Sequence, residues 1–175
     1  MQLQQTRTGL NEEKLTTPQA ELRTIGFNRK ELSSEIDINA SAETVWSILT
    51  DFGSFPEWNP FMRKMEGDLK VGGKLKVLLQ PSGAKRGTTF SPTVLKADRN
   101  REIRWIGHLF FPGLFDGEHI LEIESLEGTN RVRFIQREFF GGVFLPFLTG
   151  MLRKDTSRGF EEMNRALKDR AEETR

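Results

Sequence analysis

The sequence is poor in the side chains on which much of enzyme chemistry depends. Its 175 residues include no cysteine, no tyrosine and only two histidines, His108 and His119. The missing cysteine excludes disulfides, thiolate nucleophiles and cysteine-ligated metals, and the missing tyrosine excludes a phenolic acid or base. Two histidines cannot build a three-histidine metal site. No phosphate-binding glycine loop or dinucleotide motif is present, so we expect neither a metal nor another cofactor.

Strong charge asymmetry and long apolar runs are also missing. The 26 Lys and Arg side chains nearly balance the 25 Asp and Glu side chains, which argues against a general nucleic-acid binder. The longest nearly uncharged segment, Phe139–Leu152, has fourteen residues and is interrupted by glycine and proline. A membrane-spanning helix needs about 20 residues. With no signal-peptide pattern near the start either, we expect a cytoplasmic protein that does not bind nucleic acid.

The pattern of the chain predicts one domain preceded by an arm. Residues 1–30 are polar and show no periodicity, so we expect an N-terminal arm or tail there. The remaining 31–175 fit one domain, which typically has roughly 100–200 residues. Leu32, Ser34, Ile36 and Ile38 alternate with charged or polar residues and predict a half-buried strand over Glu31–Asn39.

The elements that follow are two short helices and a series of strands. Ser41 can cap a helix over Thr44–Asp51, and a second helical piece over Phe52–Trp58 ends before Pro60. Turn residues then separate the expected strands, which are Phe61–Glu66, Lys74–Gln80, Arg86–Ala97, Glu102–Leu109, Leu114–Ser125 and Arg131–Phe140.

A long amphipathic helix is predicted over Val143–Ala171, because apolar residues recur there at three- and four-residue steps. Gly159 in its interior disfavours a helix, so we expect close packing at that position. Strands segregated from helices indicate an α+β fold, in which a sheet packs on the helix. A sheet that curls around one helix leaves a space in which a ligand can bind.

Several segments resemble the START-like (SRPBCC) superfamily, in particular its polyketide cyclase/dehydrase and lipid-transport members. The resemblance covers roughly residues 31–171 and is carried by Glu35–Trp46 (EIDINASAETVW), Asp51–Pro60 (DFGSFPEWNP), Gly72-Gly73, Trp105, Gly107, His119 and Glu138–Gly141 (EFFG). It implies a helix-grip fold, in which a curved antiparallel sheet of six to seven strands wraps around the C-terminal helix. It further implies two short helices after the first strand and an apolar cavity that is expected to bind a small hydrophobic molecule.

Strand parity predicts a polar pair inside the sheet. A tight turn that pairs Glu127 with Asn130 makes His119 the direct cross-strand neighbour of Glu138. Two interpretations stay open for this pair. Glu138 orients His119 as a general acid or base, or the pair is a buried hydrogen bond that only orients a ligand.

Aromatic side chains supply the other candidates for a ligand site. Each also fits ordinary core packing, but together they suit an apolar or aromatic ligand with one polar end. The candidate ligand-binding residues are Trp58, Phe61, Phe90, Trp105, Phe115, His119, Gln136, Glu138, Phe140, Phe144, Phe147 and Met151, and Phe134 is a further aromatic residue of the inward face.

Two further features have competing interpretations. Phe110 and Phe111 lie in a Pro-Gly loop, where they form a lid, a membrane-touching tip or a self-association patch, or fold back into the core. A row of carboxylates faces outward from Leu114–Ser125, and a salt-bridged surface explains it better than a metal site does. We expect Arg131, Arg133 and Arg137 to pair with this row, and we expect His108 to be an ordinary surface or loop histidine.

Three functions remain open from the sequence. The favoured one is non-catalytic binding or carriage of a lipid-like or aromatic molecule by a monomer or homodimer. The second is a cyclase or dehydratase that uses His119 and Glu138 without a cofactor. The third is a module that docks on a membrane or a partner through Phe110, Phe111 and the Phe139–Leu152 segment.

Overall fold

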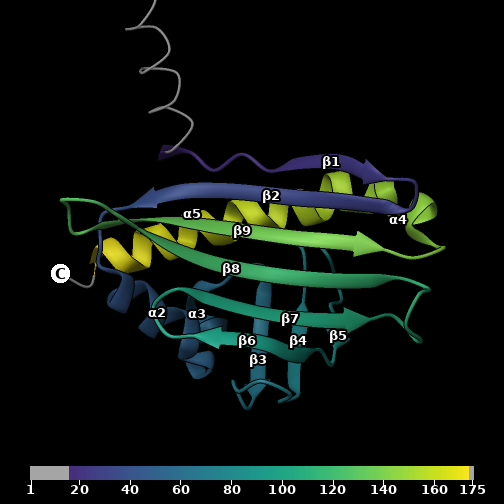
Figure 1. Ribbon diagram of the computed structural model, residues 1–175, viewed down its shortest axis with the longest axis horizontal. Helices are drawn as coiled ribbons and strands as arrows, with labels where there is room; N and C mark the ends of the chain where they lie inside the picture. Colours follow the sequence, from purple (N-terminus) through teal and green to yellow (C-terminus); the bar gives the residue numbers. More distant parts are fainter. Residues whose placement is uncertain (1–15, 174–175) are drawn as a thin grey trace, which may run out of the picture.

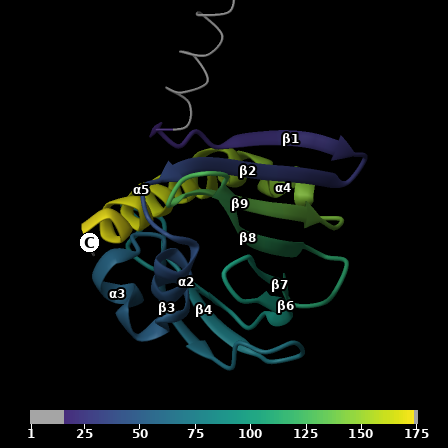
Figure 2. The same ribbon diagram turned by 60° about the vertical axis from the view of Figure 1, so that its left-hand side comes forward.

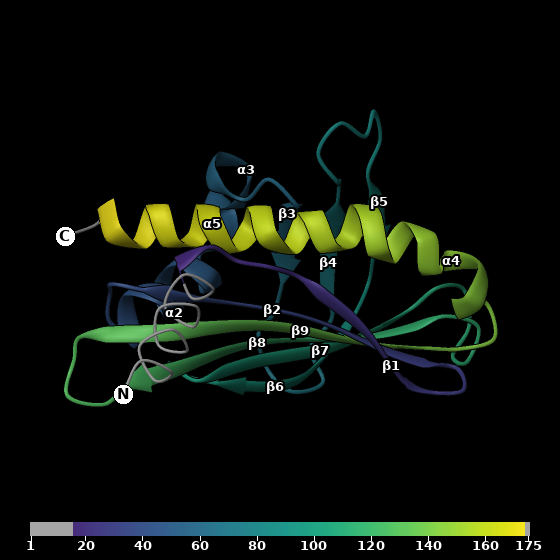
Figure 3. The same cartoon turned by 90° about the horizontal axis from the view of Figure 1, so that it is seen from above.

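A computed structural model describes residues 16–173 and shows an α+β fold in which a curved sheet holds a long helix (Figure 1). The large antiparallel sheet has the strand order β1-β2-β9-β8-β7-β6. Its strands are β1 (Glu21–Gly26), β2 (Arg29–Ile38), β6 (Thr93–Asp98), β7 (Glu102–His108), β8 (Asp116–Leu126) and β9 (Arg131–Gly141). Helix α5 (Ser157–Glu173) lies along one face of this sheet, as Figure 3 shows from above.

A second, smaller sheet closes the other side of the space beside α5 (Figure 2). It contains β3 (Met62–Gly67), β4 (Leu75–Leu79) and β5 (Thr88–Phe90). Helix α2 (Ala42–Thr50), the 3-10 turn η1 (Phe52–Ser54) and helix α3 (Phe55–Trp58) connect β2 to this sheet. Ser41 caps α2 as predicted, because its side chain accepts a hydrogen bond from the backbone N–H of Thr44.

Helix α5 buries its apolar stripe against the concave face of the large sheet. Phe160, Met163 and Leu167 are completely buried, and Gly159 on the same helix is buried too. A Cβ atom on Gly159 would lie 2.2 Å from a ring carbon of Phe61. The close packing expected at Gly159 is therefore present, and it seats the Phe61 ring against the helix.

The predicted helix over Val143–Ala171 is interrupted. The structure divides it into α4 (Leu145–Met151), a π-helical turn η2 (Leu152–Thr156) and α5. The π turn adds one residue to the helical path. It therefore rotates the inward face of α4 by about 100° relative to the inward face of α5. Leu145 and Leu152 consequently face inward, while Phe144, Phe147 and Met151 are exposed. Within residues 16–173, no helix has the length and apolar character that crossing a bilayer requires.

One other expectation about the strands is corrected, and one strand was not expected. The single strand expected over Arg86–Ala97 is two strands, β5 and β6, which belong to different sheets. Pro92 lies between them, and a proline cannot donate to a strand ladder. The segment expected as an arm contains β1, which pairs with β2 as the edge strand of the large sheet. Residues 1–15 of that segment lie outside the described residues.

The convex face of the large sheet carries ion pairs. Glu122 pairs with Arg137 at 3.7 Å, and Glu118 pairs with Arg104 at 3.1 Å. Arg131 and Arg133, expected to pair with the β8 carboxylates, instead contact Asp37 on the neighbouring strand β2. The outward carboxylate row is therefore part of a network that spans several strands, in agreement with a salt-bridged surface.

Glu102 is a further largely buried carboxylate of this network, and it contacts Lys96 at 2.6 Å and Arg104 at 2.7 Å. Partial burial raises the pKa of Glu102, but hydrogen bonds from Lys96 and Arg104 outweigh that effect and hold the pKa below its ordinary value. Glu102 therefore remains charged at neutral pH.

The packing at Gly159 gives a testable prediction. We expect Gly159→Ala to lower the free energy of unfolding by about 1–2 kcal/mol, because overpacking against the buried Phe61 ring outweighs the gain in helix propensity. Gly150→Ala in α4 is the matched control, since nothing lies within 4 Å of its added Cβ. It should leave the protein unchanged or more stable. Denaturant unfolding measures both variants, and equal effects would contradict the role given to Gly159.

Candidate functional site

The β8–β9 hairpin places the predicted polar pair together. Ile123 lies opposite Phe134, Leu121 opposite Gln136, and His119 opposite Glu138, in the register expected from the turn. Nδ1 of His119 lies 3.2 Å from Oε2 of Glu138. The His119 side chain is 5% exposed and that of Glu138 is 15% exposed. The carboxylate is thus the more accessible member of the pair.

Aromatic rings enclose the imidazole of His119. The Trp105 ring stacks on it at a centroid distance of 4.8 Å and an interplanar angle of 7°. The Phe160 ring from α5 covers it at 5.2 Å with a tilt of 57°. These contacts fix the plane of the imidazole, and the ring nitrogens then form hydrogen bonds with neighbouring side chains.

Both ring nitrogens of His119 have protein partners. Nε2 accepts from the Gln136 side-chain amide at 3.1 Å, so it carries no proton, and Nδ1–H donates to the Glu138 carboxylate. The same Gln136 amide donates to Sδ of Met163 at 3.6 Å. Both donors of the amide are used in this orientation, in which Nε2 of His119 accepts and Nδ1–H donates.

The polar cluster extends behind His119 toward β2 and α5. Asn164 is completely buried and donates to Oγ of Ser34 at 3.2 Å, and Ser34 lies opposite Gln136 in the sheet. Oε1 of Gln136 and Oδ1 of Asn164 are buried without a hydrogen-bond partner in the described part of the chain. Unpaired buried oxygens of this kind are commonly satisfied by internal water.

A cavity of about 100 Å³ lies in front of the His119–Glu138 pair, between the two sheets and the helix turn after α4. Most of its wall is apolar. The lining residues are Met62, Val77, Leu79, Phe90, Pro92, Trp105, Gly107, His108, Leu109, Phe115, Gly117, His119, Glu138, Phe140, Met151, Leu152 and Thr156.

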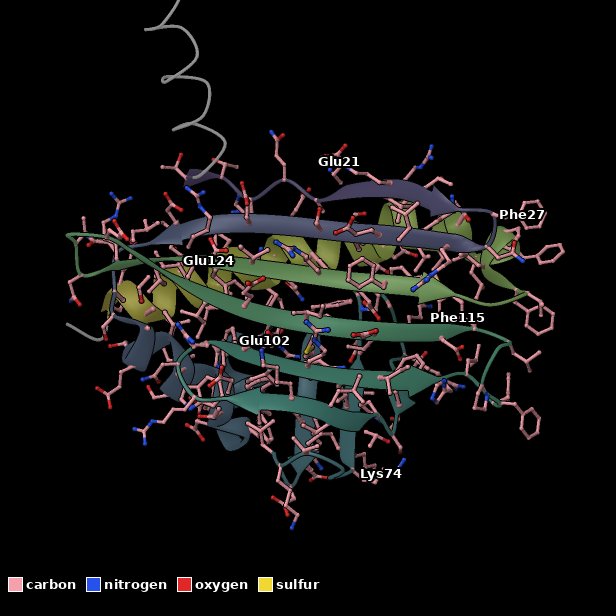
Figure 4. The ribbon with its side chains drawn as sticks, in the orientation of Figure 1. Glu21, Phe27, Lys74, Glu102, Phe115 and Glu124 are labelled. Atoms are coloured by element: carbon pink, nitrogen blue, oxygen red, sulfur yellow. The ribbon has the colours of Figure 1, made fainter. Side chains whose placement is uncertain are left out.

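The cavity brings together seven of the residues that the sequence analysis nominated for ligand binding. These are Phe90, Trp105, Phe115, His119, Glu138, Phe140 and Met151. The Phe115 and Phe140 rings stack on each other at 5.7 Å. Figure 4 shows that Phe115 lies toward the end of the sheet where β1 turns into β2.

The other nominated residues lie elsewhere. Gln136 is behind His119, Phe61 packs on Phe160, and Trp58 packs on Phe55. Phe134 is completely buried in the core. Phe144 and Phe147 are 44% and 84% exposed on the outside of α4 and its N-terminal end. Periodicity alone did not separate these residues from the cavity lining.

Sequence reasoning missed two glycines that create the space. Gly107 and Gly117 are cross-strand partners, and both line the cavity. A Cβ atom on Gly117 would lie 2.6 Å from Oε1 of Glu138, whereas a Cβ on Gly107 would meet only Pro92 at 3.7 Å. Gly117 thus makes room for the Glu138 carboxylate. The available signal was the occurrence of glycine at inward positions of two neighbouring strands.

His108 combines two environments. It lines the cavity, and its Nδ1 lies 2.6 Å from Oδ1 of Asp116, which also accepts from the backbone N–H of Gly113. The residue lies at the surface at the end of β7, in agreement with the surface or loop histidine that was expected. Among residues 16–173, no three His, Asp or Glu side chains are grouped as metal ligands.

Comparisons with solved structures identify relatives of this fold. The START superfamily protein from Mycobacterium smegmatis is 23% identical with a TM-score of 0.65, and the match covers 83% of this chain and 99% of that one. The Zhui aromatase/cyclase from a Streptomyces species is 16% identical with a TM-score of 0.67, covering 82% and 94% of the two chains.

Norcoclaurine synthase from Thalictrum flavum, in complex with dopamine and hydroxybenzaldehyde, is 13% identical with a TM-score of 0.62, covering 89% and 96%. At such identities, these three likenesses show the fold alone.

A search of curated protein sequences finds no match. Residues 29–172 match the sequence pattern of the polyketide cyclase/dehydrase and lipid transport family. Because that match spans nearly the whole helix-grip fold, the chain belongs to this family.

Proposed function

We propose that the protein binds a small apolar or aromatic molecule that carries one hydroxyl group, without transforming it. The observation that carries this proposal is the cavity in front of Glu138, whose wall is apolar except for a few polar groups. A ligand site of this kind obtains its affinity from the apolar wall and its orientation from the polar group.

Glu138 is the group that meets the ligand in this proposal, and His119 positions it. Oε2 of Glu138 accepts from His119, while Oε1 lies on the Gly117 side, at the cavity wall. The two nitrogens of His119 are both engaged by protein atoms. A ligand hydroxyl can therefore donate to the carboxylate more directly than to the imidazole.

The size of the cavity limits the ligand. Its volume of about 100 Å³ is below the range of about 300–1,000 Å³ that is usual for ligand pockets. An apolar cavity of about 150 Å³ holds benzene. A ligand with a single ring therefore already requires a small displacement of a wall residue such as Met151, which is 46% exposed, and a larger ligand requires more.

One feature favours a second candidate function, acid–base catalysis. A carboxylate that lies at an enclosed apolar wall and is held by an imidazole is placed to remove a proton from carbon next to a carbonyl group. The base takes the proton, the carbonyl compound becomes an enolate, and the carboxyl group, after exchanging its proton with solvent, returns one proton to carbon or to oxygen. The family includes cyclases and dehydrases by its name.

The proposed hydrogen bond to Glu138 predicts selectivity for phenol over benzene. We expect phenol to bind at least about tenfold more tightly, because hydrogen bonds to charged groups contribute about 1.5–3 kcal/mol. Glu138→Gln should remove most of this preference while benzene binding persists. Calorimetric titration measures both ligands, and Glu122→Gln on the convex face is the matched control.

The two cavity glycines test the same contact by geometry. Gly117→Ala should disturb the Glu138 carboxylate and reduce the phenol preference, whereas Gly107→Ala should only narrow the cavity and affect both ligands alike. Equal selectivity in wild type and all variants would assign the polar end of the site to another residue.

The cavity proposal also predicts that the protein carries its ligand when it is purified from its own source organism. Native mass spectrometry should show a small bound molecule at one copy per chain. In Gly107→Leu the bound molecule should be absent from the spectrum, because the added side chain fills the cavity. Ile106→Phe adds volume on the opposite face of the same strand and should retain it. If the wild-type spectrum shows no bound small molecule, and the protein binds no added aromatic compound, the proposal of a preformed ligand site is wrong.

Proton exchange separates the binder from the catalyst. With cyclohexanone in D₂O, a binder leaves the rate of deuterium incorporation next to the carbonyl unchanged, which is the result we expect from NMR spectra. Catalysis instead accelerates this exchange, and both Glu138→Gln and His119→Ala should then remove the acceleration. Acceleration that depends on both residues would replace the binding function with the enzymatic one.

A further inference from the structure

One end of the molecule exposes a group of large apolar side chains. Three connections meet there, namely the β1–β2 turn, the β7–β8 loop and the segment from β9 into α4 (Figures 1 and 3). We call this surface the apolar end. It consists of Phe27 (102% exposed), Phe110 (78%), Phe111 (70%), Val143 (57%), Phe144 (44%) and Phe147 (84%).

Backbone contacts join these segments into one surface. The N–H groups of Val143 and Phe144 donate to the carbonyl oxygens of Gly113 and Leu114 at 3.1 and 3.0 Å, which ties the β7–β8 loop to the start of α4. Phe27 shares a surface depression with Leu145, Pro146 and Thr149 of α4, and Figure 4 shows Phe27 at the extremity of the molecule. The apolar end is thus continuous across all three connections.

Basic side chains predominate around the apolar end. No Asp or Glu occurs in residues 22–30, 105–115 or 139–154. Arg29 and Lys30 line the depression beside Phe27, and Arg153 and Lys154 follow Met151 in exposed positions. The nearest carboxylate on the loop side belongs to Asp116, and it accepts from the Gly113 N–H and contacts His108.

We propose that the apolar end docks on an anionic lipid surface. Large exposed apolar patches mark interaction sites, and clusters of Lys and Arg beside them add attraction to acidic headgroups. A second copy of the chain fits less well, because a two-fold contact through this end would bring the basic side chains of both copies together. The rings can enter the headgroup region while Arg29, Arg153 and their neighbours contact phosphate and carboxylate groups.

The position of the cavity agrees with docking at this end. His108 and Leu109 at the root of the β7–β8 loop, together with Met151 at the end of α4, line the cavity. A molecule that leaves a bilayer beside Phe111 and Phe147 therefore meets the cavity wall nearest the membrane. Docking itself does not depend on whether the cavity holds a ligand.

Vesicle flotation of the full chain tests the proposal. The protein should float with phosphatidylcholine vesicles that contain phosphatidylserine and much less with phosphatidylcholine alone. Phe110→Ser/Phe111→Ser should abolish flotation, and Arg153→Gln/Lys154→Gln should weaken binding to the acidic vesicles about tenfold or more. Val71→Ser is the matched control, because Val71 is 70% exposed in the β3–β4 connection, outside the apolar end.

The outcomes are distinct. The proposal is wrong if the wild-type chain stays with the vesicle-free fraction, or if Val71→Ser loses flotation as fully as the phenylalanine variant. Sedimentation without vesicles gives the other decisive result, since a wild-type dimer that Phe110→Ser/Phe111→Ser converts to monomer would assign the surface to a second copy. Phenol binding by the same variants tests the cavity separately, because Phe110 and Phe111 do not line it.

Discussion

The packing of helix α5 on the concave face of the large sheet supports both the core and the candidate site. Phe160 and Met163 are completely buried in this contact, and each also reaches the polar cluster. The Phe160 ring covers His119, and the sulfur of Met163 accepts a hydrogen bond from Gln136. The helix therefore shields from bulk solvent the side of His119 that faces away from the cavity. Only the Glu138 side of the pair stays open to a ligand.

The relation between His119 and Glu138 was predictable because a tight antiparallel turn fixes every later pair of the hairpin. Once the turn after Leu126 is located, two-residue alternation assigns one face to apolar residues and the other to charges. The order of helices and strands was predictable for a similar reason, since periodicity and turn residues are local signals. These signals identify the sheet, the C-terminal helix and the face on which the site lies.

Other features depend on contacts between distant segments and were not predictable in the same way. The orientation of Glu138 depends on the space above Gly117, on the neighbouring strand. The partners of Arg131 and Arg133 depend on β2, which lies beside β9 although the two strands are far apart in sequence. The aromatic residues of the inward face could not be divided into core and cavity, because that division depends on the second sheet.

The π turn between α4 and α5 has a consequence for how this protein can change over evolutionary time. It separates a helix that is continuous along the chain into two parts whose apolar faces point in different directions. The exposed side chains of α4, such as Phe147, belong to the surface at one end of the protein, while the buried side chains of α5, such as Phe160, belong to the core. Substitutions at the exposed positions of α4 can therefore change that surface over evolutionary time with little effect on the packing of α5.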